Sequence, residues 1–380
     1  MKLTREAVNA PLEAGARVPS RSKALWLLSM TATAIAMASV PVGAASAASP
    51  SVTYYVSLGD SLASGYQPNS GHDTKIAYTD KLFEQLKQRN PGLQHIRLGC
   101  TGETSTSMVN GGKCLYPGAK SQLEAAVKFL GSHRGQVKYL TLDIGANDVD
   151  SCVSANGSID PACAQKGIAT LAQAMPKITG TLQQAGGAQT SAGMTYYNPF
   201  LALWLKGDAG KQAAKASAQL QVQTNNILVQ GYTAVGFRVA DVAGAFSSSD
   251  FSTQVQLPQI GAVPVNVARV CQLTWACTPY QDIHTNEAGH QAIAAAFACV
   301  LTRNEGRPTA SSSASPSHAT QVGVTQAAPA KPTAPPSQAA SLAFTGSSRS
   351  TPVIAGAGCA VAAAGASILI ATRRRRTRRH

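Results

Sequence analysis

The sequence lacks closely spaced metal ligands. Its seven histidines are scattered, and no two of them are separated by three residues. Zinc and related ions are held by sets of histidine, cysteine and carboxylate groups, which usually leave such local pairs in a sequence. We therefore expect no metal site and no cofactor.

Acidic residues are also scarce, 18 against 32 basic ones, and the formal net charge is +14. The excess is concentrated at the two ends of the chain. Residues 1–47 carry +3 and residues 346–380 carry +7, which leaves +4 for the part between them. Charge-driven binding of nucleic acid would need a basic folded body. We expect no nucleic-acid partner.

Residues 1–47 have the pattern of a secretory signal peptide. Scattered basic residues precede an apolar run from Ala24 to Val40, and Ala45-Ser46-Ala47 supplies the small residues of a cleavage site. A retained membrane anchor is the alternative, which the shortness of the apolar run disfavours. The pattern predicts export.

The other end of the chain is divided in a similar way. Residues 304–341 are mostly Ser, Ala, Pro and Thr, and they cannot bury enough apolar surface to offset their chain entropy. They are predicted to form a disordered stalk. Residues 342–380 then contain Leu-Ala-Phe-Thr-Gly, an uncharged stretch at about 352–371 that is long enough to cross a bilayer, and a basic tail.

This last segment resembles a sortase sorting signal of Gram-positive bacteria. Ala343 stands where the commonest form has proline, so the match is closer to the LAxTG variant read by class E sortases of actinobacteria. The resemblance implies a sortase partner that cuts between Thr345 and Gly346 and attaches Thr345 to the cell wall. The alternative is a helix that stays in the membrane. Both place residues 48–303 outside the cell, as one domain with ample length for a core.

Cysteine usage indicates an oxidising compartment, because six of the eight cysteines occur as close neighbours in sequence. Sequential pairing is the simplest connectivity, and others remain open. Of the remaining two, Cys359 lies in the predicted membrane segment and Cys299 is predicted to be a buried thiol. The proposed disulfides are Cys100 with Cys114, Cys152 with Cys163, and Cys271 with Cys277.

Strand and helix patterns alternate along residues 48–303. Helical periodicity runs from Tyr78 to a stop at Asn90-Pro91-Gly92, and residues 211–229 and 287–302 are rich in helix formers. This alternation predicts an α/β fold, a three-layer α/β/α sandwich with a central parallel sheet whose chemistry lies at the carboxyl ends of the strands. Residues rich in branched and aromatic side chains predict strands at 52–58, 94–98, 137–144, 194–197 and 236–242.

Four short motifs follow these elements in order. They are Gly59-Asp60-Ser61 after the first strand, Gly99 to Ser105 after the second, Gly145 to Val149 after the third, and Asp282 to Gly289 before the last helix. A Gly-Asp-Ser turn alone is a common loop element. Together the four resemble the blocks of the SGNH (GDSL) hydrolase family across residues 48–303. The cysteine pattern is similar to that of its secreted actinobacterial lipases and esterases.

The resemblance implies a nucleophile, a base and three oxyanion donors. Ser61 would attack the substrate carbonyl, and His284 would remove the proton of its hydroxyl, which is otherwise a poor nucleophile. The resulting oxyanion would be bound by the backbone N–H groups of Ser61 and Gly102 and by the side-chain amide of Asn147. Glycine at position 102 would let backbone and substrate approach closely.

The third member of the triad has two candidates. The family usually has an aspartate three residues before the histidine, but here that position is Gln281 and the aspartate is Asp282. Residues two apart share a face only in extended backbone, so Asp282 could orient His284 only in a strand-like segment. Some secreted relatives use a backbone carbonyl instead. We favour Asp282 and interpret Asp60 and Asp148 as structural.

The expected function is hydrolysis of a carboxylic ester through an acyl-enzyme on Ser61. The substrate would be a lipid ester or another acylated small molecule, or an acetyl group on a polysaccharide. The competing hypothesis is a surface-binding module that kept the fold without the reaction. The complete set of Ser61, Gly102, Asn147 and His284 favours the enzyme, because binding alone does not require all four. We expect a monomer.

Overall fold

The computed structural model of the chain describes residues 51–154 and 156–303. The predicted signal peptide, stalk and sorting signal lie outside these residues, as do Thr345, Gly346 and the predicted membrane segment, so these stay predictions. Within the described ranges, no helix is both long and apolar enough to cross a membrane.

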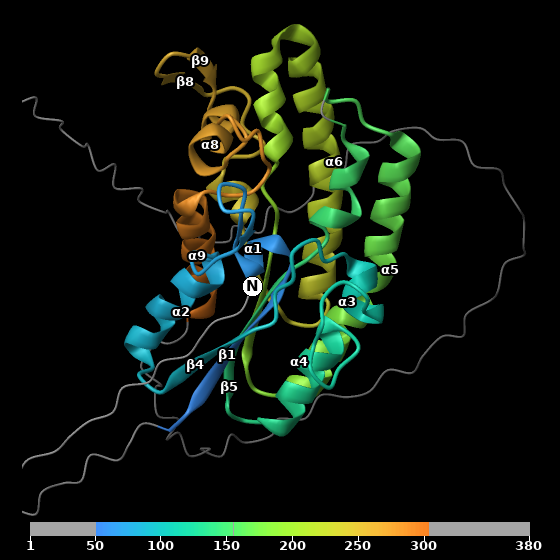
Figure 1. Cartoon of the computed structure of the whole chain (residues 1–380), viewed down its shortest axis with the longest axis vertical. Helices are drawn as coiled ribbons and strands as arrows, with labels where there is room; N and C mark the ends of the chain where they lie inside the picture. Colours follow the sequence, from blue (N-terminus) through green and yellow to red (C-terminus); the bar gives the residue numbers. More distant parts are fainter. Residues whose placement is uncertain (1–50, 155, 304–380) are drawn as a thin grey trace, which may run out of the picture. The chain divides into compact units, whose positions relative to one another are not determined.

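A five-stranded parallel sheet forms the centre of the fold, as predicted. Its order is β4-β1-β5-β6-β7, and every neighbouring pair of strands is parallel. The carboxyl ends of all five strands therefore meet at one edge of the sheet (Figure 1). The strands are β1 (Thr53–Gly59), β4 (Leu93–Arg97), β5 (Val137–Asp143), β6 (Thr190–Met194) and β7 (Arg238–Ala240).

Long helices cover both faces of this sheet, which confirms the predicted α/β/α sandwich (Figure 1). On one face α2 (Tyr78–Arg89) packs against α9 (Glu287–Leu301), and α9 also contacts β6 and β7. On the other face α4 (Gln122–Ser132), α5 (Pro161–Gly186) and α6 (Gly207–Thr233) pack in succession.

Shorter elements connect these and extend beyond the carboxyl edge of the sheet. The short helices are α1 (Ser61–Ser64), α3 (Ser105–Asn110), α7 (Val242–Ala245), α8 (Val265–Leu273), η1 (Ala146–Asp148), η2 (Asp150–Cys152) and η3 (Pro199–Lys206). The short strands form two hairpins, β2 (Tyr66–Gln67) with β3 (His72–Asp73), and β8 (Gln254–Leu257) with β9 (Gly261–Pro264).

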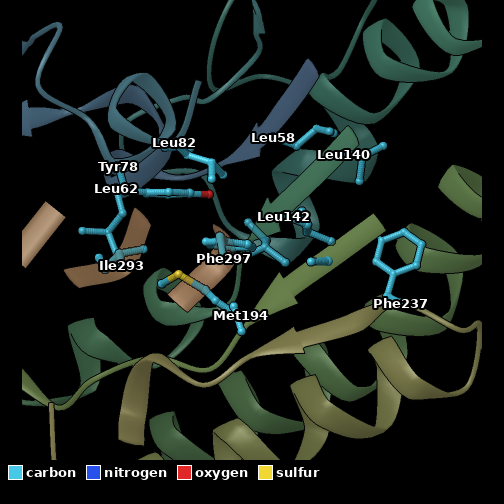
Figure 2. Close-up of a cluster of buried hydrophobic side chains, with 14 of the residues drawn as sticks. Leu58, Leu62, Tyr78, Leu82, Leu140, Leu142, Met194, Phe237, Ile293 and Phe297 are labelled. Carbon is cyan, nitrogen blue, oxygen red and sulfur yellow. The ribbon is translucent and has the colours of Figure 1, made fainter. Parts of the chain in front are cut away.

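The buried side chains form two hydrophobic clusters. The larger one joins the sheet to the helices on both of its faces, and in Figure 2 Leu142 of β5 lies near Phe297 of α9. The second cluster lies among η3, α6, α8 and the β8–β9 hairpin, and contains Leu203, Leu257 and Val267. The segment that leads to His284 thus has a small core of its own.

Several sequence expectations need correction. The predicted strand 194–197 is displaced, because β6 ends at Met194 and the residues after it continue past the sheet edge. Helices α4, α5 and α8 were not expected. The expectation of a buried free thiol at Cys299 is wrong, because its side chain on α9 is partly exposed and its sulfur is bonded.

The three proposed disulfides are all present. Cys100–Cys114 closes the loop that contains Gly102, and Cys152–Cys163 joins η2 to the start of α5. Cys271–Cys277 joins α8 to the segment that precedes His284. A disulfide of this kind typically contributes about 2–4 kcal/mol of stability, and each one here restrains a loop next to the predicted site.

Candidate active site

Ser61 lies just after the first strand, at the carboxyl edge of the sheet. β1 ends at Gly59, whose φ of +148° favours glycine, and Ser61 is the first residue of α1. A Cβ on Gly59 would lie 2.1 Å from Oδ1 of Asp143, so sterics also exclude a side chain there. Asp60 caps α1 by accepting the N–H of Leu62 at 2.9 Å. The turn thereby fixes the position of the Ser61 hydroxyl.

Two buried carboxyl groups lie behind this turn. Asp60 accepts the hydroxyl of Tyr196 at 2.6 Å, and Asp143 accepts that of Tyr78 at 2.5 Å. Asp143 also accepts the backbone N–H of Asp60 at 3.3 Å. Burial, together with the nearby charge of Asp60, raises the pKa of Asp143 well above its ordinary value. Asp143 therefore keeps its proton to a higher pH than an exposed aspartate.

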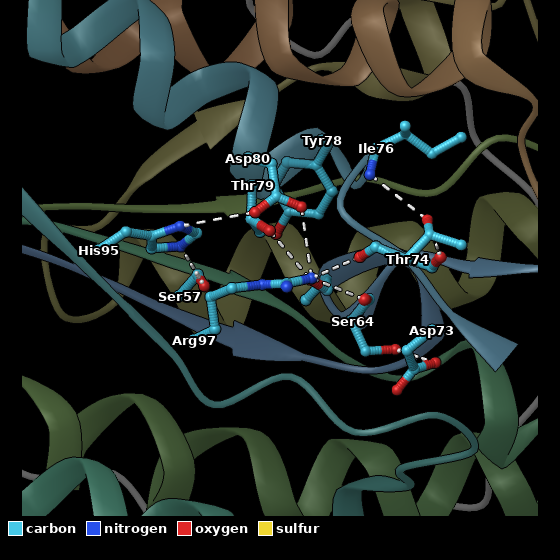
Figure 3. Close-up of polar contacts among 12 residues, drawn as sticks. Ser57, Ser64, Asp73, Thr74, Ile76, Tyr78, Thr79, Asp80, His95 and Arg97 are labelled. Carbon is cyan, nitrogen blue, oxygen red and sulfur yellow. Dashed lines mark hydrogen bonds and ion pairs between the residues drawn. The ribbon is translucent and has the colours of Figure 1, made fainter. Parts of the chain in front are cut away.

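Arg97, the last residue of β4, holds the far end of α1 (Figure 3). Its Nη2 donates to the backbone carbonyl oxygens of Ser64 and Thr74 at 2.8 and 3.0 Å. The same nitrogen lies 3.3 Å from Oδ2 of Asp80 on α2. The nucleophile helix is therefore tied to its neighbours at both ends.

Ser57, His95 and Asp80 combine the residue types of a catalytic triad a short way along the sheet (Figure 3). Ser57 Oγ and His95 Nε2 are 2.9 Å apart, and His95 Nδ1 lies 3.9 Å from Asp80. Burial, with Arg97 nearby, lowers the pKa of His95 to about 3. Because Ser57 is 0 % exposed, no substrate reaches its hydroxyl, although His95 and Asp80 are only half-buried.

His284 lies in the loop between α8 and α9, next to the nucleophile. Its Nε2 is 2.7 Å from Oγ of Ser61. The loop is held by a bridge between Thr274 and Thr285, and the N–H of Trp275 donates to the carbonyl of His284 at 3.0 Å. The ring of Tyr66 packs 4.7 Å from the imidazole. The structure thus brings together the two residues that the sequence motifs paired.

Asp282 contacts the other side of the imidazole. Nδ1 of His284 lies 2.7 Å from Oδ1 of Asp282, and the backbone N–H of His284 donates to the same oxygen at 2.8 Å. Burial raises the pKa of Asp282, but these hydrogen bonds and the charge of His284 outweigh it and leave the pKa below its usual value. Asp282 is therefore an ionised acceptor that fixes the Nδ1–H tautomer.

The backbone at this point is not the extended segment that the sequence analysis required. The chain bends at Ile283 and His284, and Gln281 before it has a φ of +46°. The bend lets one carboxylate oxygen of Asp282 accept both the backbone and the ring N–H groups of His284. The condition of a strand-like segment was therefore wrong, although the contact it was meant to allow is present.

The three predicted oxyanion donors come from separate segments. In the described part of the chain, no acceptor receives the N–H of Ser61 or of Gly102. Nδ2 of Asn147, on η1, donates one hydrogen to the carbonyl of Glu103 at 2.9 Å and has a second available. Gly102 has a φ of +78°, and a Cβ there would meet only the flexible end of Lys113. Glycine is therefore favoured at this position by the backbone angle and not by a lack of space for a side chain.

Contacts within the Cys100–Cys114 loop place Gly102 near the other donors. Its neighbour Thr101 shares a hydrogen bond with Ser64 of α1 at 2.8 Å, and Glu103 on its other side accepts from Asn147. Further along, the N–H and hydroxyl of Ser105 both donate to Asp148, at 2.9 and 2.6 Å. Asp148 thus joins the second and third motifs, in agreement with a structural role.

A small cavity of about 30 Å³ opens beside Ser61 and His284. Ser61, Asn147 and His284 all line it, whereas Gly102 does not. A larger groove of about 900 Å³ lies between α6 and residues 241–251, and Gln221 lines both spaces. The remaining residues of the small cavity are Asp60, Leu62, Ala146, Asp150, Tyr196, Tyr197, Pro199 and Ile283.

Sequence reasoning missed four residues at this site. Gln122 bonds the backbone of Gly59, Tyr196 bonds Asp60, Asp143 supports the turn and Asp150 lines the cavity. All four lie outside the motifs and far from Ser61 in sequence. A signal did exist for Asp143, because it is a charged residue at the end of an otherwise buried strand.

Comparison with solved structures finds several of related fold. An extracellular lipase from Streptomyces rimosus is 17 % identical and has a TM-score of 0.44, over 66 % of this chain and 100 % of that one. Phospholipase A1 from Streptomyces albidoflavus NA297 is 18 % identical with a TM-score of 0.38, over 56 % and 93 %. A lipase/acylhydrolase from Enterococcus faecalis is 14 % identical with a TM-score of 0.37, over 66 % and 97 %.

Comparison with curated proteins finds no match. A family model, in contrast, matches residues 57–292, which include the nucleophile turn, the three oxyanion segments and the histidine loop. The match covers more than half of the chain. The chain therefore belongs to the GDSL-like lipase/acylhydrolase family, whose members hydrolyse esters.

Proposed function

We propose that this protein cleaves carboxylic esters through an acyl-enzyme on Ser61. The observation that carries the proposal is the continuous line of contacts from nucleophile to acid. Ser61 Oγ lies 2.7 Å from Nε2 of His284, and Nδ1 of the same ring lies 2.7 Å from Asp282. A serine hydroxyl, a neutral imidazole and an ionised carboxylate in this order form the catalytic unit of acyl transfer.

The reaction follows from these contacts. As Ser61 Oγ attacks the ester carbonyl, its proton passes to Nε2 of His284, and Asp282 stabilises the imidazolium that forms. The tetrahedral intermediate collapses when the C–O bond to the alcohol breaks, and the alcohol leaves with the proton from Nε2. Water then attacks the acyl-enzyme with the same imidazole as base, which releases the acid and restores Ser61.

The negative charge on the carbonyl oxygen is proposed to be held by amide hydrogens. Ser61 and Gly102 offer backbone N–H groups without other acceptors in the described residues, and Asn147 offers its second amide hydrogen. Loss of one such donor typically lowers turnover by about two to three powers of ten. The bond from Asn147 to Glu103 orients the amide before substrate arrives.

We propose two alternative classes of substrate. A lipid ester or another acylated small molecule is the first. The second is an acetyl group on a polysaccharide, which the narrow cavity at Ser61 can hold, whereas the larger groove that shares Gln221 with it offers room for a longer acyl chain. A rate profile with p-nitrophenyl esters of increasing chain length separates them.

We also propose that the enzyme works outside the cell as a monomer. The three disulfides support export, since such bonds persist in oxidising compartments. The sequence patterns of residues 1–47 and 342–380 support a signal peptide and a surface anchor. In this proposal a sortase cuts after Thr345, or the C-terminal segment stays in the membrane.

Hydrolysis of p-nitrophenyl acetate and butyrate tests the proposed function. Purified wild-type protein is expected to hydrolyse at least one of the two, and Ser61→Ala to lose the activity while its circular dichroism spectrum and melting temperature stay unchanged. Folded wild-type protein without activity would favour the silent binding module instead. Activity of Ser61→Ala within tenfold of wild type would show that another residue is the nucleophile.

A further inference from the structure

Asp150 places a carboxyl group in the wall of the reaction cavity. It is the first residue of η2, directly after η1 with Asn147, and it lines the same cavity as Ser61 and His284. Neither the triad nor the oxyanion donors use it. A charged residue type beside a nucleophile, without an assigned task, is a candidate for substrate recognition.

The two acids whose charges act on Asp150 each accept two hydrogen bonds from side chains or backbone. Asp60 accepts from the N–H of Leu62 and the hydroxyl of Tyr196, and Asp148 accepts twice from Ser105. The carboxyl of Asp150, in contrast, receives no hydrogen bond from any residue in the described ranges. Asp150 is half-buried, and it lines the cavity. A molecule that enters the cavity can therefore supply a partner for this carboxyl.

The groups around Asp150 disfavour the ionised form of its carboxyl when the cavity is empty. Burial, then the charges of Asp60 and Asp148, raises the pKa of Asp150 to about 8. Tyr197 also faces it, with a pKa raised by burial and by the Asp150 charge. From α5, which packs against η2, Asp160 and Lys166 are exposed to solvent. The remaining titratable groups that line the cavity are Ser61, Tyr196 and His284.

We infer that Asp150 selects esters that carry a primary alkylammonium group, with its carboxylate bound to the ammonium. This inference rests on the proposed ester hydrolysis at Ser61. The residues that line the cavity include neither lysine nor arginine, so an anionic substrate group would find no countercharge among them. A cation, in contrast, could bind the carboxyl of Asp150, to which no described residue donates a hydrogen bond. The neighbouring acids Asp60 and Asp148 disfavour anions there.

The size and lining of the cavity agree with this ligand. The cavity has room for water-sized groups, and an –NH₃⁺ group is of that size. Tyr196 and Tyr197 also line the cavity, and aromatic rings attract cations placed over their faces. At pH 7, ionising a group with a pKa of about 8 lowers the apparent affinity only about tenfold. The bound ammonium supplies the compensating charge.

Matched pairs of esters test the inference on both sides of the ester bond. Ethyl 3-aminopropanoate is compared with ethyl butanoate, and 5-aminopentyl acetate with hexyl acetate, so that within each pair –NH₃⁺ replaces –CH₃. For the wild-type full-length protein we expect kcat/KM at pH 8 to favour the cationic ester of at least one pair by tenfold or more. Because Asp150 gains a proton as the pH falls, this ratio should decrease towards pH 6.

Asp150→Asn keeps the shape of the side chain and removes its charge. We expect it to lower the wild-type ratio at least tenfold and to make it independent of pH between 6 and 8. The control is Asp208→Asn, an exposed aspartate paired with Lys211 on α6, which should leave the ratio within twofold. Equal ratios in wild type and Asp150→Asn, or a wild-type ratio near one in both pairs, would overturn the inference.

The same measurements separate this inference from the proposed function. If wild type hydrolyses the uncharged esters without preferring the cationic ones, the ester hydrolase proposal stands and the role of Asp150 fails. If neither the four esters nor p-nitrophenyl acetate is hydrolysed, the proposed function fails. The inference about Asp150 then fails as well, because it depends on that function.

Discussion

The side-chain amide of Gln122 bonds both backbone groups of Gly59. Its Oε1 accepts the N–H of Gly59 at 2.7 Å, and its Nε2 donates to the carbonyl oxygen at 3.0 Å. Gln122 begins α4, more than sixty residues along the chain, and it is 0 % exposed. One buried amide thus connects a covering helix to the residue just before the nucleophile turn.

Gln122→Ala is expected to reduce both stability and turnover. It leaves the buried N–H of Gly59 without a partner, which costs about 1–3 kcal/mol, whereas the carbonyl keeps the N–H of Cys100. The change also loosens the turn that positions Ser61. Urea unfolding and p-nitrophenyl acetate kinetics measure the two effects. The control, Gln88→Ala, removes an exposed glutamine of α2 and should change neither. Normal turnover in Gln122→Ala would show that the turn holds its geometry without the amide.

Asp282→Asn is expected to lower kcat by several powers of ten, on the order of 10⁴ as in serine protease triads. The amide cannot stabilise the imidazolium, and it favours the wrong tautomer of His284. The kinetics should be measured with unchanged circular dichroism as the test of folding. A decrease below tenfold would assign the orienting role to a backbone carbonyl. His284→Ala should be severe in either case, because it removes the proton acceptor itself.

Asp143 gives a prediction about pH and stability. Its pKa is raised by burial and by Asp60, so the folded protein binds a proton that the unfolded chain releases above its ordinary pKa. Stability therefore decreases as the pH rises from about 4 towards the folded pKa. Asp143→Asn removes this linkage, so its urea midpoint should fall less than that of wild type between pH 4 and pH 8. A parallel decrease in both proteins would contradict the raised pKa.

Chelators are expected to leave the activity unchanged. In the proposed mechanism the oxyanion is held by the amide hydrogens of Ser61, Gly102 and Asn147, and no step needs a cation. Rates with p-nitrophenyl acetate should agree within error before and after dialysis against EDTA. Inhibition by EDTA that one added metal ion reverses would show that a metal has a part in the reaction.

The fold could be predicted because its signals are local. Helix α2 shows its apolar stripe and its stop at Asn90 in a dozen residues, and the strand ends coincide with the motifs. Helix α5 was missed although Leu171, Met175, Ile178 and Leu182 form a buried stripe. Its interior Pro176 is a residue that sequence rules treat as a helix break, and here the surrounding packing overrides that rule.

The site was predictable only where a motif carries it. Ser61 and His284 stand in motifs whose chemistry implies a partner, so their contact could be expected. Gln122 acts through a contact that only the folded chain supplies, and only the fold brings Asp150 to the cavity, so nothing in their own sequence surroundings indicates either. The bend at Ile283 was missed for a related reason, because a spacing rule for regular backbone cannot describe a turn stabilised by its own aspartate.

The two hydrophobic clusters position different members of the catalytic pair. Ser61 follows a strand of the larger cluster. His284 lies between α9, in the larger cluster, and α8, most of whose buried residues lie in the second cluster although Leu273 at its end lies in the larger one. The distance between nucleophile and base therefore depends on how firmly the two clusters are docked together. A disturbance confined to the smaller one would separate the proton acceptor from its donor while the sheet stays intact, because parts of a protein open with different free energies. Inactivation on heating should then precede the loss of secondary structure.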